Sequence, residues 1–270
     1  MSIADKQYSG LEDKSYMRSI LIIAGSDSCG GAGIQADIKA AYRLGYHPMT
    51  VISALTAQNS IGVFDIMPVP REFISKQINV ILDDIMPDAV KIGMLFSIDA
   101  IAAVADMLLM YDLSPVVLDP LIQASTGAAL LERGGMDRIK EKLFPIVSLI
   151  TPNRHEAELL LNIKIDTLRE LEEAAKALYD MGTMVVITGY CERDKVIDLA
   201  YDGRNFFYIE DKAIDIRHGH GSGCVFSTSI AIYLAEGKPL QRAVQLAHEF
   251  TKQAIKRGYP LGRGSGPVFP

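Results

Sequence analysis

Short apolar runs alternate with amphipathic segments along most of the chain. Residues 20–24 form a continuous apolar run that ends at Gly25, a pattern typical of a strand buried on both faces. Residues 34–44 then carry apolar side chains at helical spacing. The same alternation predicts further strands at 49–55, 89–92, 115–118, 146–150 and 184–187, and further helices at 73–82, 98–110, 135–143, 154–161 and 240–256.

Local signals mark the remaining elements. Thr167 and Glu170 have the spacing of a capping box, which predicts a helix that starts there and ends before Gly182. Residues 195–201 and 205–209 flank an Asp-Gly turn and predict a hairpin. The chain from Gly258 is rich in Gly and Pro and is expected to be irregular surface chain.

Alternating strands and helices predict an α/β fold, a three-layer α/β/α sandwich with a mostly parallel central sheet. The hairpin is expected to add a small antiparallel edge at one side of that sheet. Residues 1–18 are polar and mixed in charge, so we expect a flexible lead-in there. No composition break divides the rest, which predicts a single domain over residues 19–270.

Composition and charge narrow the classes of partner and the cellular compartment that we expect. The net charge is −6 and no basic block occurs, which argues against nucleic acid or an anionic membrane as a partner. Cys29, Cys191 and Cys224 are scattered and have no metal-binding spacing, which fits a reducing compartment. No apolar run is long enough to span a bilayer, and residues 1–18 lack the apolar core of a signal peptide. A cytoplasmic location is therefore expected.

The candidate chemistry centres on HGHGSGCVFSTSIAIY, which begins at His218. Three glycines in six residues are followed by an apolar run, which predicts a sharp loop that opens a helix near Ser222. The unpaired N–H groups at a helix start and the helix dipole together favour an anion. Cys224 would lie in that first turn, where the dipole lowers a thiol pKa. A phosphate site is one interpretation, and a Gly-rich turn with a buried cysteine is the other.

Other polar residues follow the predicted strands, and ligands in such sheets bind beyond the carboxyl ends of the strands. Gln58 could bind the edge of a heterocycle, or Asn59 could simply hold a turn there. Asp119 could bind a metal or cap a turn. Asn153 and Glu156 could support a metal or phosphate, or form a helix cap with a dipole-compensating carboxylate.

The first Gly-rich loop, GSDSCGGAG at residues 25–33, also joins a predicted strand to a helix. Its glycines do not make G-x-G-x-x-G, which argues against a nicotinamide site. Asp37 falls one turn into the following helix, where it could compensate the helix dipole.

Six segments occur in order along the chain: AGSDSCGGAGIQADIKA, ALTAQNSIGV, KIGML, VVLDP, LITPNRHEAELL and HGHGSGC. Together they resemble the bacterial hydroxymethylpyrimidine/phosphomethylpyrimidine kinases, members of the ribokinase-like superfamily that act in thiamine biosynthesis. The resemblance covers nearly the whole chain from residue 20. It implies a ribokinase-like fold, ATP and Mg²⁺ as the phosphoryl donor and its metal, a small-molecule pyrimidine as substrate, and a homodimer.

The resemblance also implies roles for individual residues. It implies catalytic roles for Gly221, Ser222 and Gly223 as an anion hole and for Cys224 at the position of the catalytic base. It implies that the pyrimidine is bound by Gln58, Asp37, Met94, Gly31, Ala32 and Gly33. It implies nucleotide contacts for Asn153, Thr188 and Gly189, and metal support for Glu156 and Asp119.

The chain departs from the family pattern at two places. Thr188-Gly189-Tyr190-Cys191 stands where the family often has Lys-Gly-Gly-His, so a lysine that would face the nucleotide phosphates is absent. Ala128 stands where the family has an aspartate after Ser-Gly. Two alternatives therefore remain open: a pyridoxine/pyridoxal kinase on the same fold, and a weakly active relative that senses a ligand.

Overall fold

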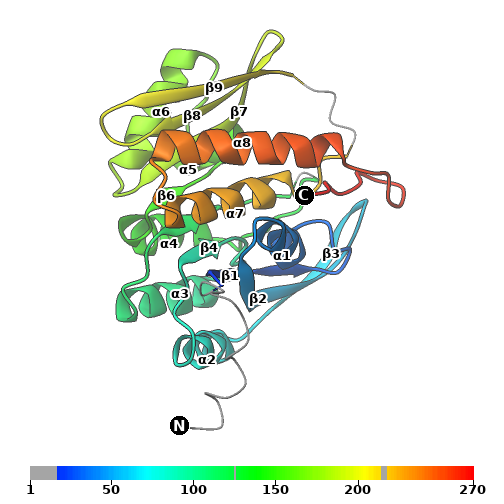
Figure 1. The fold of residues 1–270 in the computed structure, drawn as a ribbon, viewed down its shortest axis with the longest axis vertical. Coiled ribbons are helices and arrows are strands. Elements are labelled where there is room, and N and C mark those ends of the chain that lie inside the picture. The colour runs from blue at the N-terminus through cyan, green and yellow to red at the C-terminus, as the bar shows by residue number, and fades with distance from the viewer. Residues whose placement is uncertain (1–16, 125, 214–217) are drawn as a thin grey trace, which may run out of the picture.

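One nine-stranded sheet organises the protein, in the order β3-β2-β1-β4-β5-β6-β7-β8-β9 (Figure 1). A computed structural model describes residues 17–124, 126–213 and 218–270. The strands are β1 (Ser19–Asp27), β2 (His47–Asn59), β3 (Gly62–Pro68), β4 (Ala89–Ile92), β5 (Val116–Leu118), β6 (Leu149–Ile150), β7 (Met184–Glu192), β8 (Lys195–Tyr201) and β9 (Phe206–Lys212). The pairs from β2 through β1 and β4 to β7 are parallel, which confirms the predicted α/β class.

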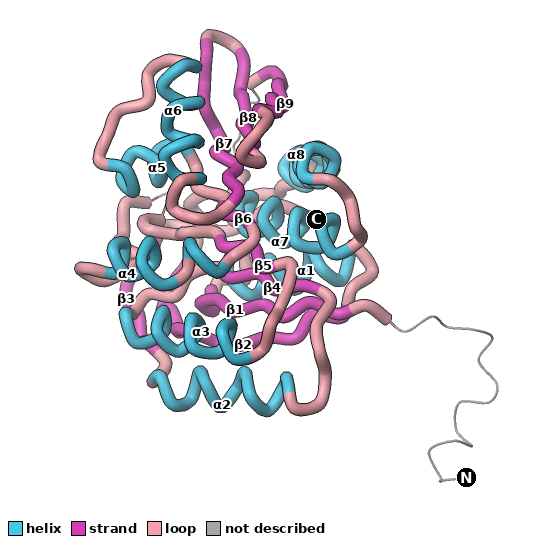
Figure 2. The backbone as a smooth tube through the Cα atoms, turned by 90° about the vertical axis from the view of Figure 1, so that its left-hand side faces the viewer, coloured by secondary structure: helices cyan, strands magenta, loops and turns pink. Residues whose placement is uncertain are grey.

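Helices cover both faces of the sheet. They are α1 (Gly33–Arg43), α2 (Arg71–Leu82), α3 (Ile98–Met110), α4 (Gly135–Lys142), α5 (Arg154–Leu161), α6 (Leu168–Tyr179), α7 (Ser222–Ala235) and α8 (Leu240–Lys256), with a short 3₁₀ turn at Phe144–Ile146. Figure 2 shows α1, α7 and α8 on one side of the strands and α2 to α6 on the other. The predicted three layers are therefore present.

The strand residues explain the two layers, because alternate side chains of a strand point to opposite faces. In β1, Ile20 and Ile22 pack with α1, α7 and α8, whereas Leu21 and Ile23 pack with the core under α2 to α6. All four are buried, as a continuous apolar run predicts for a central parallel strand. The sheet is thus fixed between two cores, and its strand ends hold the loops in place.

Antiparallel strands close the sheet at both edges, whereas the sequence indicated only one such edge. The predicted hairpin is present as β8 and β9, which pair antiparallel beyond β7. At the opposite edge, β3 pairs antiparallel with the end of β2, and this strand was not predicted. The reason is physical: no residue of β3 is buried, so its sequence lacks the apolar run that marks the inner strands.

Two predicted strand boundaries were wrong. Thr56 to Asn59 were expected just beyond a strand, but β2 continues through them because β3 supplies hydrogen-bond partners. The strand predicted at residues 146–150 is shorter, since its start is occupied by the 3₁₀ turn. The capping box of Thr167 and Glu170 is confirmed at the start of α6. The predicted lead-in lies outside the described residues except for Met17 and Arg18.

Within the part of the chain that the structure describes, no helix has the length and apolar character that crossing a bilayer requires.

Candidate active site

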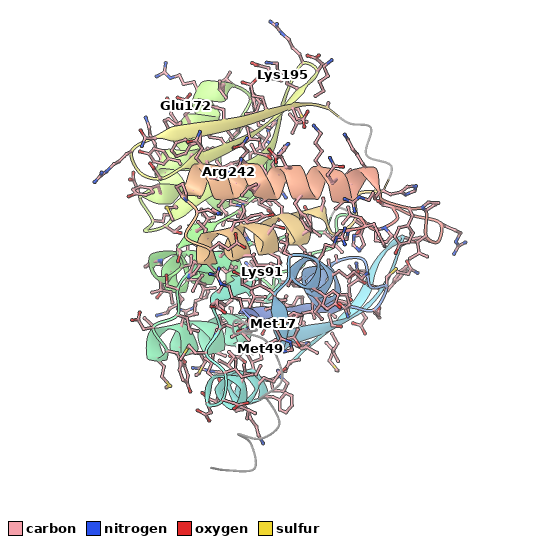
Figure 3. All side chains as sticks on the ribbon, in the orientation of Figure 1. Met17, Met49, Lys91, Glu172, Lys195 and Arg242 are labelled. Carbon is pink, nitrogen blue, oxygen red and sulfur yellow. The ribbon has the colours of Figure 1, made fainter. Side chains whose placement is uncertain are left out.

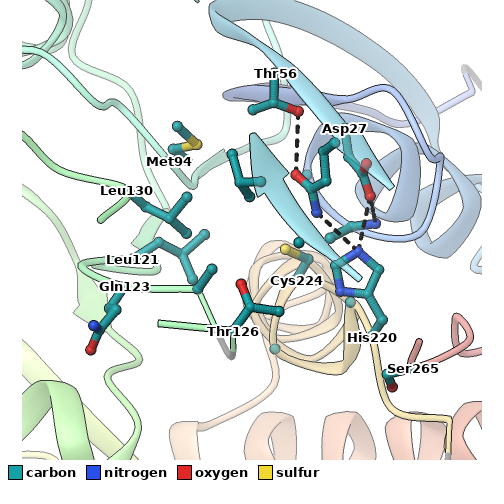
Figure 4. A pocket seen from close by; sticks show the side chains of 18 of the residues that line it. Asp27, Thr56, Met94, Leu121, Gln123, Thr126, Leu130, His220, Cys224 and Ser265 are labelled. Carbon is teal, nitrogen blue, oxygen red and sulfur yellow. Dashed lines mark hydrogen bonds and ion pairs between the residues drawn. The ribbon is translucent and has the colours of Figure 1, made fainter. Parts of the chain in front are cut away.

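A cavity of about 1020 Å³ lies at the carboxyl edge of the parallel strands (Figure 4). Its walls come from segments far apart in the sequence: the end of β1 and the loop after it, the β2–β3 turn, the loops after β4, β5 and β6, the start of α7, and the C-terminal tail. Such a convergence at strand ends is where open α/β sheets bind ligands. The volume suits a small heterocycle together with phosphate groups.

The floor of the cavity is the Gly-rich turn that opens α7. Gly221 is the N-cap residue, with φ of 86°, and Gly221, Ser222, Gly223 and Cys224 all line the cavity. No carboxylate occupies the first turn of α7, so the helix start is left to an outside anion. The predicted Gly-rich turn and the helix that it opens are therefore present, and we call residues 221–224 the anion loop below.

The two Gly-rich loops are in direct backbone contact. A Cβ atom on Gly221 would collide with the carbonyl oxygen of Gly31, and one on Gly31 would collide with the His220 ring. Gly31 itself is buried behind the wall, whereas its neighbours Ala32 and Gly33 line the cavity. The glycines thus allow two loops from opposite ends of the chain to meet.

A hydrogen-bonded network joins the two loops to β2. The Asp27 carboxylate accepts hydrogen bonds from the amides of Cys29, Gly31 and Ala32 at 2.8–2.9 Å and lies 3.0 Å from His220 Nε2. Burial alone would raise the pKa of Asp27, but the bonds from His220 and the amides of Ala32 and Cys29 outweigh it and lower the pKa. The carboxylate is therefore ionised, and its bonds to the amides fix the conformation of the loop that follows β1.

Gln58 belongs to the same network. Its Nε2 lies 3.3 Å from His220 Nε2, and its Oε1 accepts from the Thr56 hydroxyl at 3.2 Å. Asn59 holds the following turn through its Oδ1, which accepts from the Ile61 amide at 2.9 Å. Both interpretations of this segment are thus compatible with the structure, because Asn59 holds the turn and both Gln58 and Asn59 line the cavity. Met94 lines the opposite wall (Figure 4).

Asp37 does not line the cavity, and its predicted contact with the substrate was wrong. Its side chain is fully buried and bonds to Lys91 Nζ at 2.9 Å and to the Thr228 hydroxyl at 2.8 Å. The interpretation of Asp37 as dipole compensation for α1 was also wrong, because α1 has no acidic residue in its first turn. Asp37 instead ties α1 to β4 and α7 behind the anion loop.

Lys91 is the cation of this buried pair (Figure 3). Burial would lower its pKa, but the negative charge of Asp37, supported by Asp119, raises the pKa overall, so the ammonium group stays protonated. Cys224 is also buried, and this burial raises its pKa to about 12 despite the opposing charge of Lys91. The expectation that the helix start lowers this pKa was therefore wrong, because burial has the larger effect, and the thiol is neutral at pH 7 before any ligand binds.

Two buried carboxylates, Asp119 and Glu156, lie near the anion loop. A Cβ atom on Gly223 would lie 3.9 Å from Asp119 Oδ2, and that oxygen also accepts from the Ser227 hydroxyl at 3.2 Å. Glu156 completes a capping box with Asn153, so the predicted cap is confirmed. Burial raises the pKa of Asp119 to about 6, and burial with repulsion from Asp119 raises that of Glu156 to about 8.

These carboxylates fit a divalent cation. Glu156 Oε1 is buried and has no hydrogen-bond partner among the described residues. A cation there would satisfy this oxygen and neutralise the repulsion that raises both pKa values. The described residues contain no cluster of three or more His, Cys, Asp and Glu side chains that could hold a metal alone. Mg²⁺ commonly uses one or two carboxylates and completes its shell with phosphates and water.

A second hollow of about 440 Å³ adjoins the cavity and shares Asn153 and His155 with it. Thr188 and Gly189 also line it, so these predicted nucleotide contacts lie together. The Gly189 amide donates to Asp198 at 2.9 Å, and Asp198 in turn lies 2.9 Å from His248. Arg154 lines the hollow too, but its guanidinium already pairs with Glu158 and Asp166.

Several site residues were not found from the sequence. Asp27, His220 and Lys91 lie within the quoted segments, but their partners are distant in the chain, so their sequence neighbours do not reveal these contacts. Residues 263–265 line the cavity, although the tail was expected to be surface chain. The tail is held by a bridge between His220 and Pro267 and by the Gly266 amide, which donates to His218. The repeated glycines of the tail were the available sign that it packs closely on other segments, because glycine permits such close approach of the backbone.

Comparisons with a family model and with individual known sequences agree on one family. The sequence pattern of the phosphomethylpyrimidine kinase family matches residues 27–269. The hydroxymethylpyrimidine/phosphomethylpyrimidine kinase of Bacillus subtilis is 40% identical over 251 residues, which is 92% of this chain and 93% of that protein. The thiamine biosynthesis bifunctional protein ThiED of Geobacter sulfurreducens is 43% identical over 252 residues, 93% of this chain. This chain spans about half (51%) of that longer protein.

Solved structures of two related enzymes have the same fold. The ADP complex of Bacillus subtilis pyridoxal kinase has a TM-score of 0.86 and 36% sequence identity, covering 94% of this chain and 97% of that one. Phosphomethylpyrimidine kinase (thiD) from Clostridium difficile 630 has a TM-score of 0.79 and 34% identity, covering 88% and 99%.

Proposed function

The chain belongs to the phosphomethylpyrimidine kinase family, and we propose that it transfers phosphoryl groups from ATP to 4-amino-5-hydroxymethyl-2-methylpyrimidine. The first transfer would give the monophosphate and the second the diphosphate used for thiamine. The observation that carries this proposal is the placement of Gln58 and the anion loop on the walls of one cavity. That cavity therefore offers a heterocycle-binding amide and a phosphate-binding helix start.

The substrate would lie with its ring against Gln58 and its hydroxymethyl oxygen toward the anion loop. The Gln58 amide offers both a donor and an acceptor to the ring edge. The N–H groups of residues 221–224 would stabilise the charge of the transferred group, since phosphoryl transfer depends mainly on positioning and charge neutralisation. In each transfer an acceptor oxygen bonds to the γ-phosphorus while the bond to ADP breaks.

The nucleotide would occupy the second hollow beside Thr188 and Gly189. Its terminal phosphates would then point through the shared wall at Asn153 toward the anion loop. Asp119 and Glu156 would hold Mg²⁺, which when bound neutralises phosphate charge and orients the phosphates. The homodimer implied by the resemblance and the cytoplasmic location expected from the composition stay predictions.

Cys224 would accept the proton of the hydroxymethyl group. Because its pKa is held at about 12, the thiolate fraction rises about tenfold per pH unit in the accessible range. Cys224→Ala is expected to lower kcat by about 10²-fold at neutral pH, the lower end of the usual effect of a general base. The ratio of wild-type to variant kcat is expected to increase between pH 7 and pH 9.

The ratio of the two kcat values reports on Cys224 alone. Glu156 and Asp119 titrate in both proteins, so their effect on kcat cancels in the ratio. Steady-state ADP release at saturating ATP measures it. A ratio that stays constant with pH would assign Cys224 to packing alone.

Gln58→Ala is expected to raise KM for the pyrimidine by about tenfold and to leave KM for ATP within about twofold. The reason is the loss of one or two hydrogen bonds to the ring edge, each worth about 0.5–1.5 kcal/mol. Exposed Gln253 on α8 lies away from the cavity, so Gln253→Ala serves as the matched control. Equal losses for the pyrimidine and ATP would contradict a ring-edge role.

A pyridoxal kinase activity remains the second candidate, and the resemblance to the Bacillus subtilis pyridoxal kinase structure favours it. Its substrate also carries a hydroxymethyl group on a nitrogen heterocycle, so Gln58 and the anion loop could serve either compound. A relative that only senses a ligand would bind one of these heterocycles without ATP turnover.

A further inference from the structure

We infer that Arg263 recognises the phosphate of the monophosphate substrate and thereby governs the second phosphorylation. The inference rests on the proposed function and adds a specificity residue to it. Arg263 lines the main cavity, although the C-terminal tail carries no element of the sheet or of the covering helices. Among the described residues of the cavity wall it is the one arginine, and no lysine accompanies it.

Hydrogen bonds fix the three residues that follow Arg263 in the tail. The Gly264 amide donates to the Ser60 hydroxyl at 3.1 Å, which joins the segment to the β2–β3 turn. Ser265 Oγ lies 3.4 Å from the Gly219 amide, just before the anion loop, and the His220 amide donates to the Gly266 carbonyl at 3.2 Å. Arg263 is therefore presented between the turn that follows Gln58 and the anion loop.

The tight packing of this segment supports the same placement. A Cβ atom on Gly264 would collide with the backbone of Ser60, and one on Gly266 would collide with the backbone of Tyr259. The segment thus lies directly on its neighbours. A guanidinium carried on such an anchored backbone loses less freedom when it binds a ligand than one on an unattached tail.

The two proposed acceptors differ mainly in charge. The hydroxymethyl compound is neutral at its reacting oxygen, whereas a phosphate monoester carries about −1.5 to −2 charges at pH 7. The monoester must approach the γ-phosphate of ATP, so its binding needs a cation that the alcohol does not need. Thr188 stands where the resemblance implies a lysine, and Arg154 is already paired with Glu158 and Asp166.

An arginine suits this task. Its planar guanidinium offers paired N–H donors that match two phosphate oxygens, and its charge does not titrate near neutral pH. Bound next to the anion loop, it would hold the acceptor phosphate while one oxygen of that group attacks the γ-phosphorus. The proposal therefore separates ring recognition by Gln58 from phosphate recognition by Arg263.

The test compares Arg263→Ala and Arg263→Lys with wild type on both acceptors, the hydroxymethylpyrimidine and its monophosphate. We expect Arg263→Ala to lower kcat/KM for the monophosphate by about 10–100-fold, the usual effect of losing a charged hydrogen bond, and to lower it far less for the alcohol. Arg263→Lys is expected to recover part of the loss. Arg257→Ala, at the C-cap of α8 and off the cavity wall, should affect neither acceptor.

Equal loss on both acceptors, or no loss on the monophosphate, would overturn the inference while leaving the kinase function intact. Calorimetric titration of the pyrimidine monophosphate into each protein tests the inference even if wild type turns over neither acceptor, an outcome that would refute the proposed function. A weaker affinity of at least tenfold for Arg263→Ala supports phosphate recognition, and an unchanged affinity contradicts it.

Discussion

Gly221→Ala is expected to lower kcat by about 10³-fold or more. The added Cβ would collide with the Gly31 carbonyl, and the backbone at this position has φ of 86°, which side chains rarely adopt. The anion loop would have to move, and with it all of its N–H donors. Removal of a single such donor already costs about 10²–10³-fold in enzymes that stabilise a developing negative charge.

The strain of a positive φ can be separated from the collision. Gly45 has φ of 80°, but a Cβ there would meet nothing within 4 Å. Gly45→Ala is therefore expected to cost only about 1–2 kcal/mol of folding free energy and to keep kcat near wild type. Steady-state kinetics and circular dichroism of both variants test this. A fully folded Gly221→Ala protein with wild-type kcat would show that the anion loop does not bind the transferred group.

Lys91→Met is expected to lower the free energy of unfolding by about 3–5 kcal/mol. The substitution leaves Asp37 buried without its cation, although the Thr228 hydroxyl still bonds to it. A buried charge that loses its partner is costly because no water replaces the lost interaction. Urea unfolding followed by circular dichroism measures the change.

Two control variants identify the cause of this loss of stability. Lys195 forms an exposed pair with Glu210, so Lys195→Met is expected to cost less than about 1 kcal/mol (Figure 3). The double variant Lys91→Met/Asp37→Leu removes both buried charges and is expected to recover most of the stability lost in Lys91→Met. If the double variant were as unstable as the single one, the loss would reflect packing and not the uncompensated carboxylate.

The central part of the fold could be predicted because burial shapes its sequence directly. Strands buried on both faces require apolar runs such as that of β1, and the helices that cover them require one apolar stripe. The exposed edge strand β3 has no such requirement, which is why its sequence gave no signal. The length of β2 depends on pairing with β3 and could not be predicted without it.

Parts of the site could be predicted where residues close together in the sequence determine the backbone conformation. The turn of residues 221–224 and the capping box of Asn153 and Glu156 follow from neighbouring residues. Gln58 follows from its position at the carboxyl end of β2. The position of Asp37 was predicted wrongly because its partner Lys91 is distant in the sequence, and the two meet only when α1 packs on the sheet.

The network of Asp27 and His220 has the same origin, since these residues lie at opposite ends of the chain. The C-terminal tail was expected to be surface chain because its Gly and Pro content predicts irregular structure. Irregular structure is what the tail has, but its glycines also let it lie against the β2–β3 turn and form a wall of the cavity. Composition predicts the conformation of such a segment and not the surface on which it packs.

The central claim is that the cavity phosphorylates a pyrimidine alcohol, and the most direct measurement is product analysis with the purified protein, MgATP and either 4-amino-5-hydroxymethyl-2-methylpyrimidine or pyridoxal. Phosphorus NMR of the reaction mixture distinguishes a monophosphate ester from a diphosphate. We predict that the pyrimidine yields its diphosphate with release of two ADP per pyrimidine, and that it is used with a higher kcat/KM than pyridoxal. Preferential phosphorylation of pyridoxal, or binding of the pyrimidine without any ADP release, would contradict the claim.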